Sequence, residues 1–169
     1  MKNSNICLKQ GDLLKAADTG MLNAIVHGCN CFCTMGGGIA AQIRAKYPEA
    51  YEADKETVRG DKNKLGTYTF VKSHINTTTL KAVEFYVINA YTQYDFGSDG
   101  HKHCYFDYKA FEKIFTDFNN DPKVQGKIIG IPWIGCGLAG GSPKKVLSIL
   151  EKVVKTYHVW IYDFNPSVS

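Results

Sequence analysis

The chain has 169 residues, 44% of them hydrophobic, and a formal net charge of +4 from 20 basic and 16 acidic side chains. This size and composition indicate one globular domain over residues 1–169, with a sizeable core. No apolar run is long enough for a membrane helix, and the first five residues lack the apolar segment of a secretory signal, so we expect a cytoplasmic protein with no membrane partner. The basic residues are too scattered to indicate a nucleic-acid groove.

Six cysteines are many for this length, and a cytoplasmic location would keep them reduced. His27, Cys29, Cys31 and Cys33 alternate, so their side chains would share one face of an extended segment. Three further side chains are available to complete a zinc site: His101, His103 and Cys104. The C-x-C-x-C spacing is not that of common zinc sites, so we expect no metal and interpret Cys29 as a small apolar side chain.

In the first half of the chain, the predicted elements begin with a short strand over residues 5–9. A polar or partly helical link over 15–23 follows, and then a buried strand over 24–29. Three glycines precede a helix over 38–45. Pro48 favours the start of a second helix that extends to residue 59.

In the second half, residues 66–74 alternate as a strand and residues 83–90 form a more apolar one, joined by a connection short enough for a hairpin. Asp107 caps a predicted helix over 108–118. A strand over 124–131, a helix over 144–156 and a last strand over 158–164 complete the chain. Because strands and helices alternate, we predict a three-layer α/β/α fold with a mixed, mostly parallel central sheet.

Two glycine-rich loops each leave a strand and open a helix. The first contains Gly36, Gly37 and Gly38, and the second runs from 135 to 141 and ends at Ser142, a good N-cap. Both would lie at the carboxyl edge of one sheet, where the free N–H groups of a helix N-terminus suit phosphate. The spacing matches neither the Rossmann nor the P-loop pattern. The pair therefore indicates a pyrophosphate site, the alternative being two ordinary strand-to-helix connections.

Four features occur in the order found in macrodomains, along nearly the whole chain. They are Gly11-Asp12-Leu13, the segment 26–39, the run Ile134-Gly135-Cys136-Gly137-Leu138, and a final strand with aromatic residues at its end. The ordered set resembles the macrodomain family. The run His27-Gly28-Cys29-Asn30 resembles the branch that contains the ADP-ribose-1″-phosphate phosphatases, in which loop one begins with histidine.

The resemblance implies a site for ADP-ribose. Asp12 would accept a hydrogen bond from the adenine amine, the Leu13 N–H would reach a ring nitrogen, and Phe164 would stack on the base. A turn or cap role for Asp12 and core packing for Phe164 are the alternatives. The pyrophosphate and distal ribose would contact Gly36, Gly37, Gly38 and Ile39 on one side and Gly135, Cys136, Gly137, Leu138 and Ala139 on the other.

His27 and Asn30 are the catalytic residues that the resemblance implies. His27 would act beside the 1″-phosphate as nucleophile or general acid/base, and Asn30 would hydrogen-bond the distal ribose. A histidine at a strand end whose ring nitrogens bond to backbone is the alternative for His27. Three more candidates for the distal end lie on one loop: His101, Lys102 and His103. A solvated loop is the alternative for them.

The chain departs from the ADP-ribose glycohydrolase branch at two places. Residues 89–93 contain no lysine, which argues against covalent lysyl catalysis, and residues 137–142 contain no aspartate. Ser142 offers phosphate a hydroxyl, although its N-cap role explains it equally well.

We expect hydrolysis of ADP-ribose 1″-phosphate to ADP-ribose and phosphate by a monomer without cofactor. The alternatives are a reader of free or macromolecule-attached ADP-ribose, a hydrolase of ADP-ribosyl linkages on protein or nucleic acid, and a protein that sequesters a related nucleotide.

Overall fold

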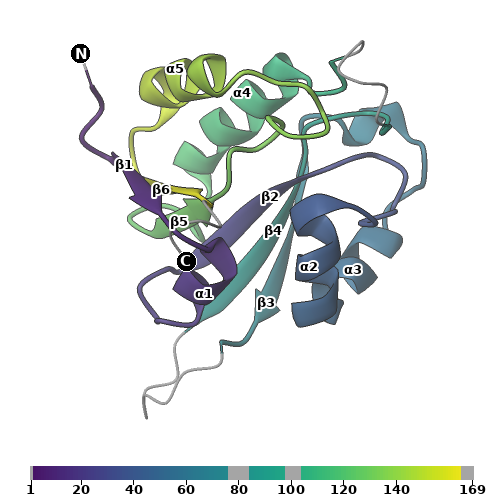
Figure 1. The fold of residues 1–169 in the computed structure, drawn as a ribbon, viewed down its shortest axis with the longest axis horizontal. Coiled ribbons are helices and arrows are strands. Elements are labelled where there is room, and N and C mark those ends of the chain that lie inside the picture. The colour runs from purple at the N-terminus through teal and green to yellow at the C-terminus, as the bar shows by residue number, and fades with distance from the viewer. Residues whose placement is uncertain (1, 76–83, 98–103, 165–169) are drawn as a thin grey trace.

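The structure is a computed structural model that describes residues 2–75, 84–97 and 104–164. Its centre is a six-stranded sheet in the order β1-β6-β5-β2-β4-β3 (Figure 1). The strands are β1 (Ile6–Gln10), β2 (Ala24–Cys29), β3 (Tyr68–Ser73), β4 (Phe85–Tyr91), β5 (Ile128–Ile131) and β6 (His158–Asp163). β3 pairs with β4 in the antiparallel sense and the other neighbouring pairs are parallel, which confirms the mixed, mostly parallel sheet.

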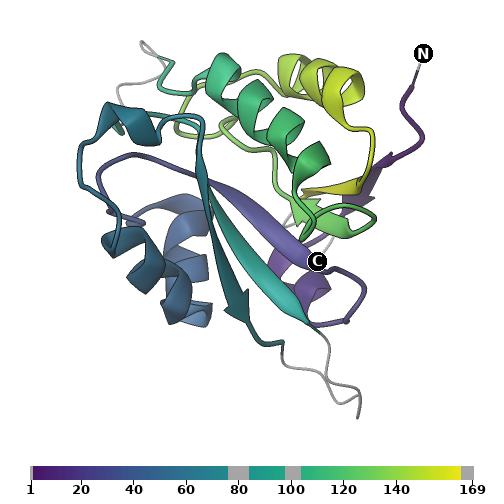
Figure 2. The same cartoon turned by 180° about the vertical axis from the view of Figure 1, so that it is seen from behind.

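Helices cover both faces of this sheet, as Figures 1 and 2 show. One layer contains α1 (Leu13–Ala17), α2 (Gly38–Lys46) and α3 (Pro48–Lys55), and the other contains α4 (Tyr108–Asp117) and α5 (Pro143–Val153). Short 3-10 turns occupy Lys62–Lys64 and Phe118–Asn120. The predicted three-layer arrangement is confirmed. Within the described residues, no helix has the length and apolar character that crossing a membrane requires.

Each face of the sheet has its own core because successive strand residues point to opposite faces. Val26 of β2 packs with Phe111 and Phe115 of α4, whereas its neighbour Ile25 packs with Ile43 of α2. The aromatic residues that the sequence places at helical spacing along α4 are all buried. These two cores hold β2 and β5 side by side and so fix the loops that leave them.

Most predicted boundaries lie within three residues of the observed ones, and three regions deserve an explanation. A helix begins at Leu13, inside the expected strand-to-link region, because Asp12 Oδ1 accepts from the N–H groups of Leu14 at 2.8 Å and Lys15 at 3.4 Å. α3 ends at Lys55 instead of residue 59. β5 begins at Ile128 instead of residue 124, because residues 121–126 form turns.

His27 lies in the core beneath α3. Its ring is fully buried, and Nε2 lies 2.7 Å from Asn89 Oδ1. The Asn89 amide donates its N–H groups to the carbonyl of Ala50 and the hydroxyl of Thr69, so its oxygen accepts and His27 Nε2 carries the proton. The Cys29 sulfur, 3.5 Å from Nε2, packs against the same ring. The ring therefore bonds to a side chain, and not to backbone as the alternative interpretation had it.

We predict that Gly130→Val destabilises the protein. A Cβ at Gly130 in β5 would lie 2.6 Å from Leu22 Cδ1 and 2.8 Å from Leu13 Cδ1, both buried. Overpacking of this kind costs about 1–3 kcal/mol, measurable by urea unfolding. Gly137→Val is the matched control, because a Cβ at Gly137 meets nothing within 4 Å. Equal unfolding midpoints for the two variants would contradict the packing argument.

We also predict that His27 makes stability depend on pH. Burial lowers its pKa from 6.5 to about 4, partly opposed by the hydrogen bond with Asn89. Above pH 6.5 the ring is neutral in both states. Between these values the unfolded chain binds a proton that the folded chain does not, so stability falls as pH falls. The loss between pH 7 and pH 5 is about 2 kcal/mol.

Urea unfolding at both pH values measures this loss. His27→Gln, which keeps an N–H donor toward Asn89, should lose less stability than the wild type on acidification. His158→Gln, at an exposed histidine, is the control and should follow the wild type. The same acid sensitivity in His27→Gln and wild type would show that another group is responsible.

Candidate functional site

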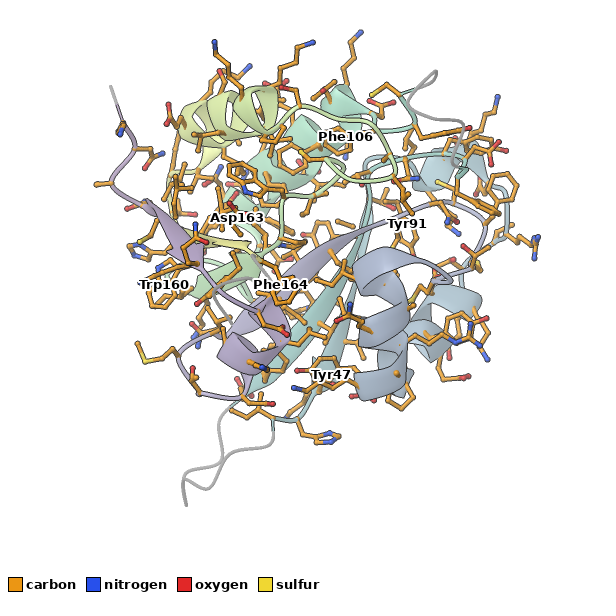
Figure 3. The ribbon with its side chains drawn as sticks, viewed as in Figure 1. Tyr47, Tyr91, Phe106, Trp160, Asp163 and Phe164 are labelled. Atoms are coloured by element: carbon orange, nitrogen blue, oxygen red, sulfur yellow. The ribbon has the colours of Figure 1, made fainter. Side chains whose placement is uncertain are left out.

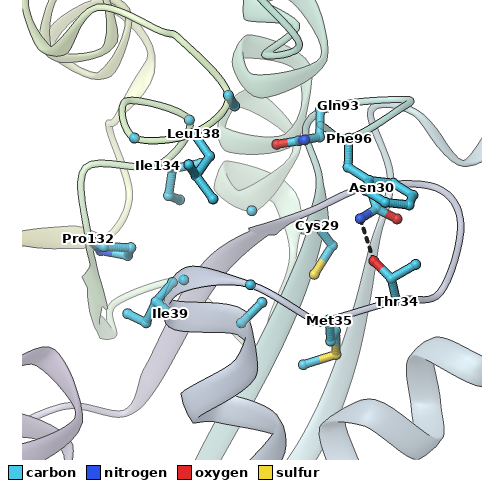
Figure 4. Close-up of a pocket in the computed structure, with 18 of the residues that line it drawn as sticks. Cys29, Asn30, Thr34, Met35, Ile39, Gln93, Phe96, Pro132, Ile134 and Leu138 are labelled. Atoms are coloured by element: carbon cyan, nitrogen blue, oxygen red, sulfur yellow. Dashed lines mark hydrogen bonds between the residues drawn. The ribbon is translucent and has the colours of Figure 1, made fainter. Parts of the chain in front are cut away.

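A pocket of about 550 Å³ opens where β2, β4 and β5 end, at the carboxyl edge of the sheet (Figure 4). Loop one (residues 30–37) forms one side, and loop two (residues 132–141) forms the other. The lining includes Asn30, Gly36, Gly37, Gly38, Ile39, Gly135, Gly137, Leu138 and Ala139, all predicted from the sequence. Figure 4 shows Leu138 and Ile134 facing Ile39 across this space.

A second pocket of about 440 Å³ adjoins the first, and both lie in the size range of ligand sites. The two share four lining residues: Ile39, Pro132, Trp133 and Gly137. The second also contains Asp12, Leu13, Cys136 and Phe164, so the predicted base-binding residues come together. Cys136, predicted beside the pyrophosphate, lines this second pocket and not the first. The two pockets form one elongated cleft.

Loop one is shaped by its own side chains. Asn30 donates to the Thr34 hydroxyl at 2.8 Å, the dashed bond in Figure 4, and accepts from the Phe32 N–H at 2.8 Å. Cys33 and Met35 have positive φ angles of 58° and 40°, unusual for side-chain-bearing residues. This tight path ends at Gly37, which caps α2 without a side-chain hydrogen bond. The first N–H groups of α2 are therefore free to face an anion.

Loop two is a compact turn closed by the Gly141 N–H, which donates to the Gly135 carbonyl at 2.6 Å. Gly135 has φ of 75°, and a Cβ there would lie 2.1 Å from the Phe106 ring. Among the described residues, the N–H groups of Gly137 and Leu138 have no hydrogen-bond partner. Because both residues line the first pocket, these N–H groups are available to an anion there, as the second cradle requires.

The second pocket combines one carboxylate with aromatic walls. Both cap bonds of Asp12 go to Oδ1, so its predicted cap role and a ligand role are compatible. Trp133, Tyr162 and Phe164 supply the rings. Phe164 follows β6, lies beside α1 in Figure 3 and is 54% exposed, so core packing does not explain it. This surface suits a flat heterocycle with an amine substituent.

The described lining of the two pockets contains no lysine, arginine or histidine. Its charged side chains are Asp12 in the second pocket and Asp54 in the first. Burial raises the pKa of Asp54, while the hydrogen bond from Tyr91 and the charge of Lys64 oppose the rise. An anion in the cleft would thus be held by backbone N–H groups and not by side-chain cations.

His27 is absent from the lining of both pockets. Its ring is fully buried and bonds to Asn89, so the described structure does not bring it into contact with the pocket space, and its role as nucleophile or general acid/base stays a prediction. Gly28 and Cys29, the next two residues of β2, do line the first pocket, and the Cys29 sulfur lies 3.5 Å from His27 Nε2, so the His27 ring lies directly behind the lining.

The three cysteines of loop one have separate environments. Cys29 ends β2 and lines the first pocket, with its thiol toward Met35 in Figure 4. Burial raises the pKa values of Cys29 and Cys31, which keeps both thiols protonated. Cys33 lies 3.1 Å from the Asp54 carbonyl. No group of three His, Cys, Asp or Glu side chains suited to a metal occurs in the described part of the chain. His101, Lys102 and His103 lie outside it.

Several lining residues were missed in the sequence. They are Thr34, Met35, Gln42, Asp54, Gln93, Phe96, Pro132, Trp133 and Tyr162. Pro132 and Trp133 directly precede the recognised loop-two motif, so their position was a usable signal. Gln93 follows β4 at the same edge, which was also a usable signal, whereas Asp54 lies in a helix and carries none.

Comparison with known proteins agrees with this architecture. Residues 26–150 match the family model of the Macro domain. An uncharacterized 17.5 kDa protein of Enterobacteria phage T4 is 33% identical over 145 residues, covering 84% of this chain and 86% of that protein. A protein of Candida albicans named ADP-ribose 1''-phosphate phosphatase is 29% identical over 139 residues, covering 73% of this chain and 84% of that protein.

The fold also matches solved structures. Thermosipho africanus DarTG in complex with ADP-ribose superposes with a TM-score of 0.71 at 17% identity, covering 98% of this chain and 43% of that chain. At that identity the likeness shows the fold alone. The family match covers most of the chain and includes both glycine loops. The chain belongs to the Macro domain family.

Proposed function

We propose that the cleft binds ADP-ribose. Adenine occupies the second pocket with its amine on Asp12 and its face on Phe164. The diphosphate lies between the free N–H groups of loop one and loop two, and the distal ribose lies beside Asn30. The observation that carries the proposal is that the uncapped N-terminus of α2 and the unpaired N–H groups of Gly137 and Leu138 line one pocket, which adjoins an aromatic pocket with one carboxylate.

The proposed reaction is hydrolysis of ADP-ribose 1″-phosphate. The named Candida albicans relative supports it. The chemistry of the cleft supports it as well, because backbone N–H groups stabilise charge that develops on phosphoryl oxygens. The end of the first pocket near Asn30 and Phe96 is where the terminal phosphate would lie.

A reader of ADP-ribose, free or attached to a macromolecule, is the second candidate. The observation that favours it is the described lining of the first pocket, which lacks histidine and every cationic side chain. Binding without turnover needs only the neutral cradles and the base pocket.

Phosphorus NMR separates the candidates. The purified protein is incubated with ADP-ribose 1″-phosphate, and His27→Gln runs beside it. We expect the phosphomonoester signal to convert to inorganic phosphate in both samples, because His27 does not line the cleft. An intact phosphomonoester with shifted diphosphate resonances identifies a reader or a hydrolase of another linkage. Resonances that do not move would refute ADP-ribose binding itself.

We predict that Asp12→Asn weakens ADP-ribose binding about tenfold in isothermal titration calorimetry, because a hydrogen bond to a charged acceptor contributes about 1.5–3 kcal/mol. Asparagine also caps helices well, so α1 should persist. Asp107→Asn is the matched control, since Asp107 caps α4 in the same manner and lies outside both pockets. Equal affinities of the two variants for ADP-ribose would show that Asp12 does not bind the adenine.

A further inference from the structure

The carboxyl group of Asp54 is a buried polar group that the proposed binding mode leaves unused. Asp54 lies in the last turn of α3, lines the first pocket and is 1% exposed. Its Oδ1 accepts from the Tyr91 hydroxyl at 2.8 Å. Its Oδ2 is buried and has no hydrogen-bond partner among the described residues. An unpaired buried carboxyl oxygen is costly, so its presence points to a partner supplied from the pocket.

The position of this carboxyl is fixed by contacts to loop one. The Cys33 thiol lies 3.1 Å from the Asp54 carbonyl, which ties the end of α3 to the loop. Lys64 is buried beside them, with Nζ 3.1 Å from the Cys31 carbonyl and 3.5 Å from the Cys33 sulfur. The Lys64 ammonium also lies 4.8 Å from the centre of the Tyr91 ring. Asp54 is thus held against the segment that carries Asn30, where the distal ribose would lie.

Hydrolysis of a phosphomonoester at this end requires a proton for the departing sugar oxygen. His27 is enclosed elsewhere, and the Cys29 thiol, whose pKa burial raises well above its ordinary value, is a weak acid near neutral pH. Burial raises the pKa of the Asp54 carboxyl, opposed by the hydrogen bond from Tyr91 and the charge of Lys64, and a raised pKa favours the acid form that can donate a proton. Asp54 and Cys29 are the titratable side chains in the described lining of the first pocket.

We propose that Asp54 is the proton-transfer residue of this site, acting on the 1″ oxygen directly or across one bound water. The inference rests on the proposed phosphatase function. Water attacks phosphorus, a new P–O bond forms, and the bond from phosphorus to the 1″ oxygen breaks. The Asp54 carboxylic acid gives its proton to that oxygen, which leaves as the hydroxyl of ADP-ribose. The carboxylate recovers a proton from the water that became part of phosphate.

Asp54→Asn tests the proposal. The amide keeps the shape and an oxygen for the Tyr91 hydroxyl but cannot donate a proton as an acid. We expect kcat for phosphate release to fall at least 100-fold, the lower end for removal of a general acid, with ADP-ribose affinity within about threefold of wild type. Asp61→Asn, at the half-buried cap of the neighbouring 3-10 turn and outside both pockets, is the matched control and should keep full activity.

Tyr91→Phe tests the role of Asp54 through the pH profile of kcat, which would not shift if Asp54 had a purely structural role. Loss of the hydroxyl removes a donor that stabilises the Asp54 carboxylate, so the pKa of Asp54 should rise. Because the acid form is the active one, the alkaline limb of the kcat profile should move to higher pH. An unmoved limb would overturn the proposal, and this variant decides the question if Asp54→Asn does not fold.

The possible outcomes distinguish a failure of the proposed role of Asp54 from a failure of the proposed phosphatase function. Phosphate release by wild type and by Asp54→Asn at similar rates overturns the inference and leaves the phosphatase standing. Loss of binding together with turnover in Asp54→Asn assigns a structural role and also overturns it. A wild type that binds ADP-ribose but releases no phosphate refutes the phosphatase function, and the inference with it.

Discussion

The parallel pairing of β2 with β5 is the constraint on which the cleft depends. Ala24 lies opposite Ile129 and Ile25 opposite Gly130, so the two strands run side by side toward the same edge. Each then enters a glycine loop, and unpaired N–H groups remain at the uncapped start of α2 and at Gly137 and Leu138 of loop two. Because the two loops come from adjacent strands, their orphan donors face one space. Gly130 keeps this pair close to α1, whose Leu13 packs against it.

The two faces of β2 have different surroundings, one bordering the cleft and the other packed in the core. Gly28 faces the cleft, where a Cβ would lie 2.7 Å from the Thr92 hydroxyl oxygen and 2.9 Å from Ile134. The other face carries His27, which fills a buried site with Asn89. The imidazole there joins β2 to β4, and through Asn89 to the Ala50 carbonyl of α3. Its position explains how a histidine inside a ligand-loop motif can serve packing instead of chemistry.

The sequence was sufficient for features that local rules govern. Alternating elements predicted the layers, and the glycine loops with Asp12 predicted most of the cleft, because strand-to-loop-to-helix transitions follow from local pattern. The sequence was insufficient where a contact between distant residues determines the burial or orientation of a side chain. Whether His27 faces the cleft depends on which helix layer covers that face of β2. Asp54 sits in a polar helix, and its partner Tyr91 is 37 residues away, so no local pattern indicates its burial.

The described lining of the cleft has no cationic side chain, so backbone N–H groups would hold a bound phosphate. In that lining no cation separates the phosphate from the buried carboxyl of Asp54. A carboxylate beside a phosphate dianion is repelled, so phosphate at the distal end would favour the protonated form of Asp54. By linkage, the protonated form would in turn bind the phosphomonoester more tightly. In the proposed reaction the substrate therefore helps to prepare the acid that cleaves it. Departure of phosphate removes that repulsion and returns the Asp54 pKa toward the balance between burial, which raises it, and Tyr91 and Lys64, which lower it.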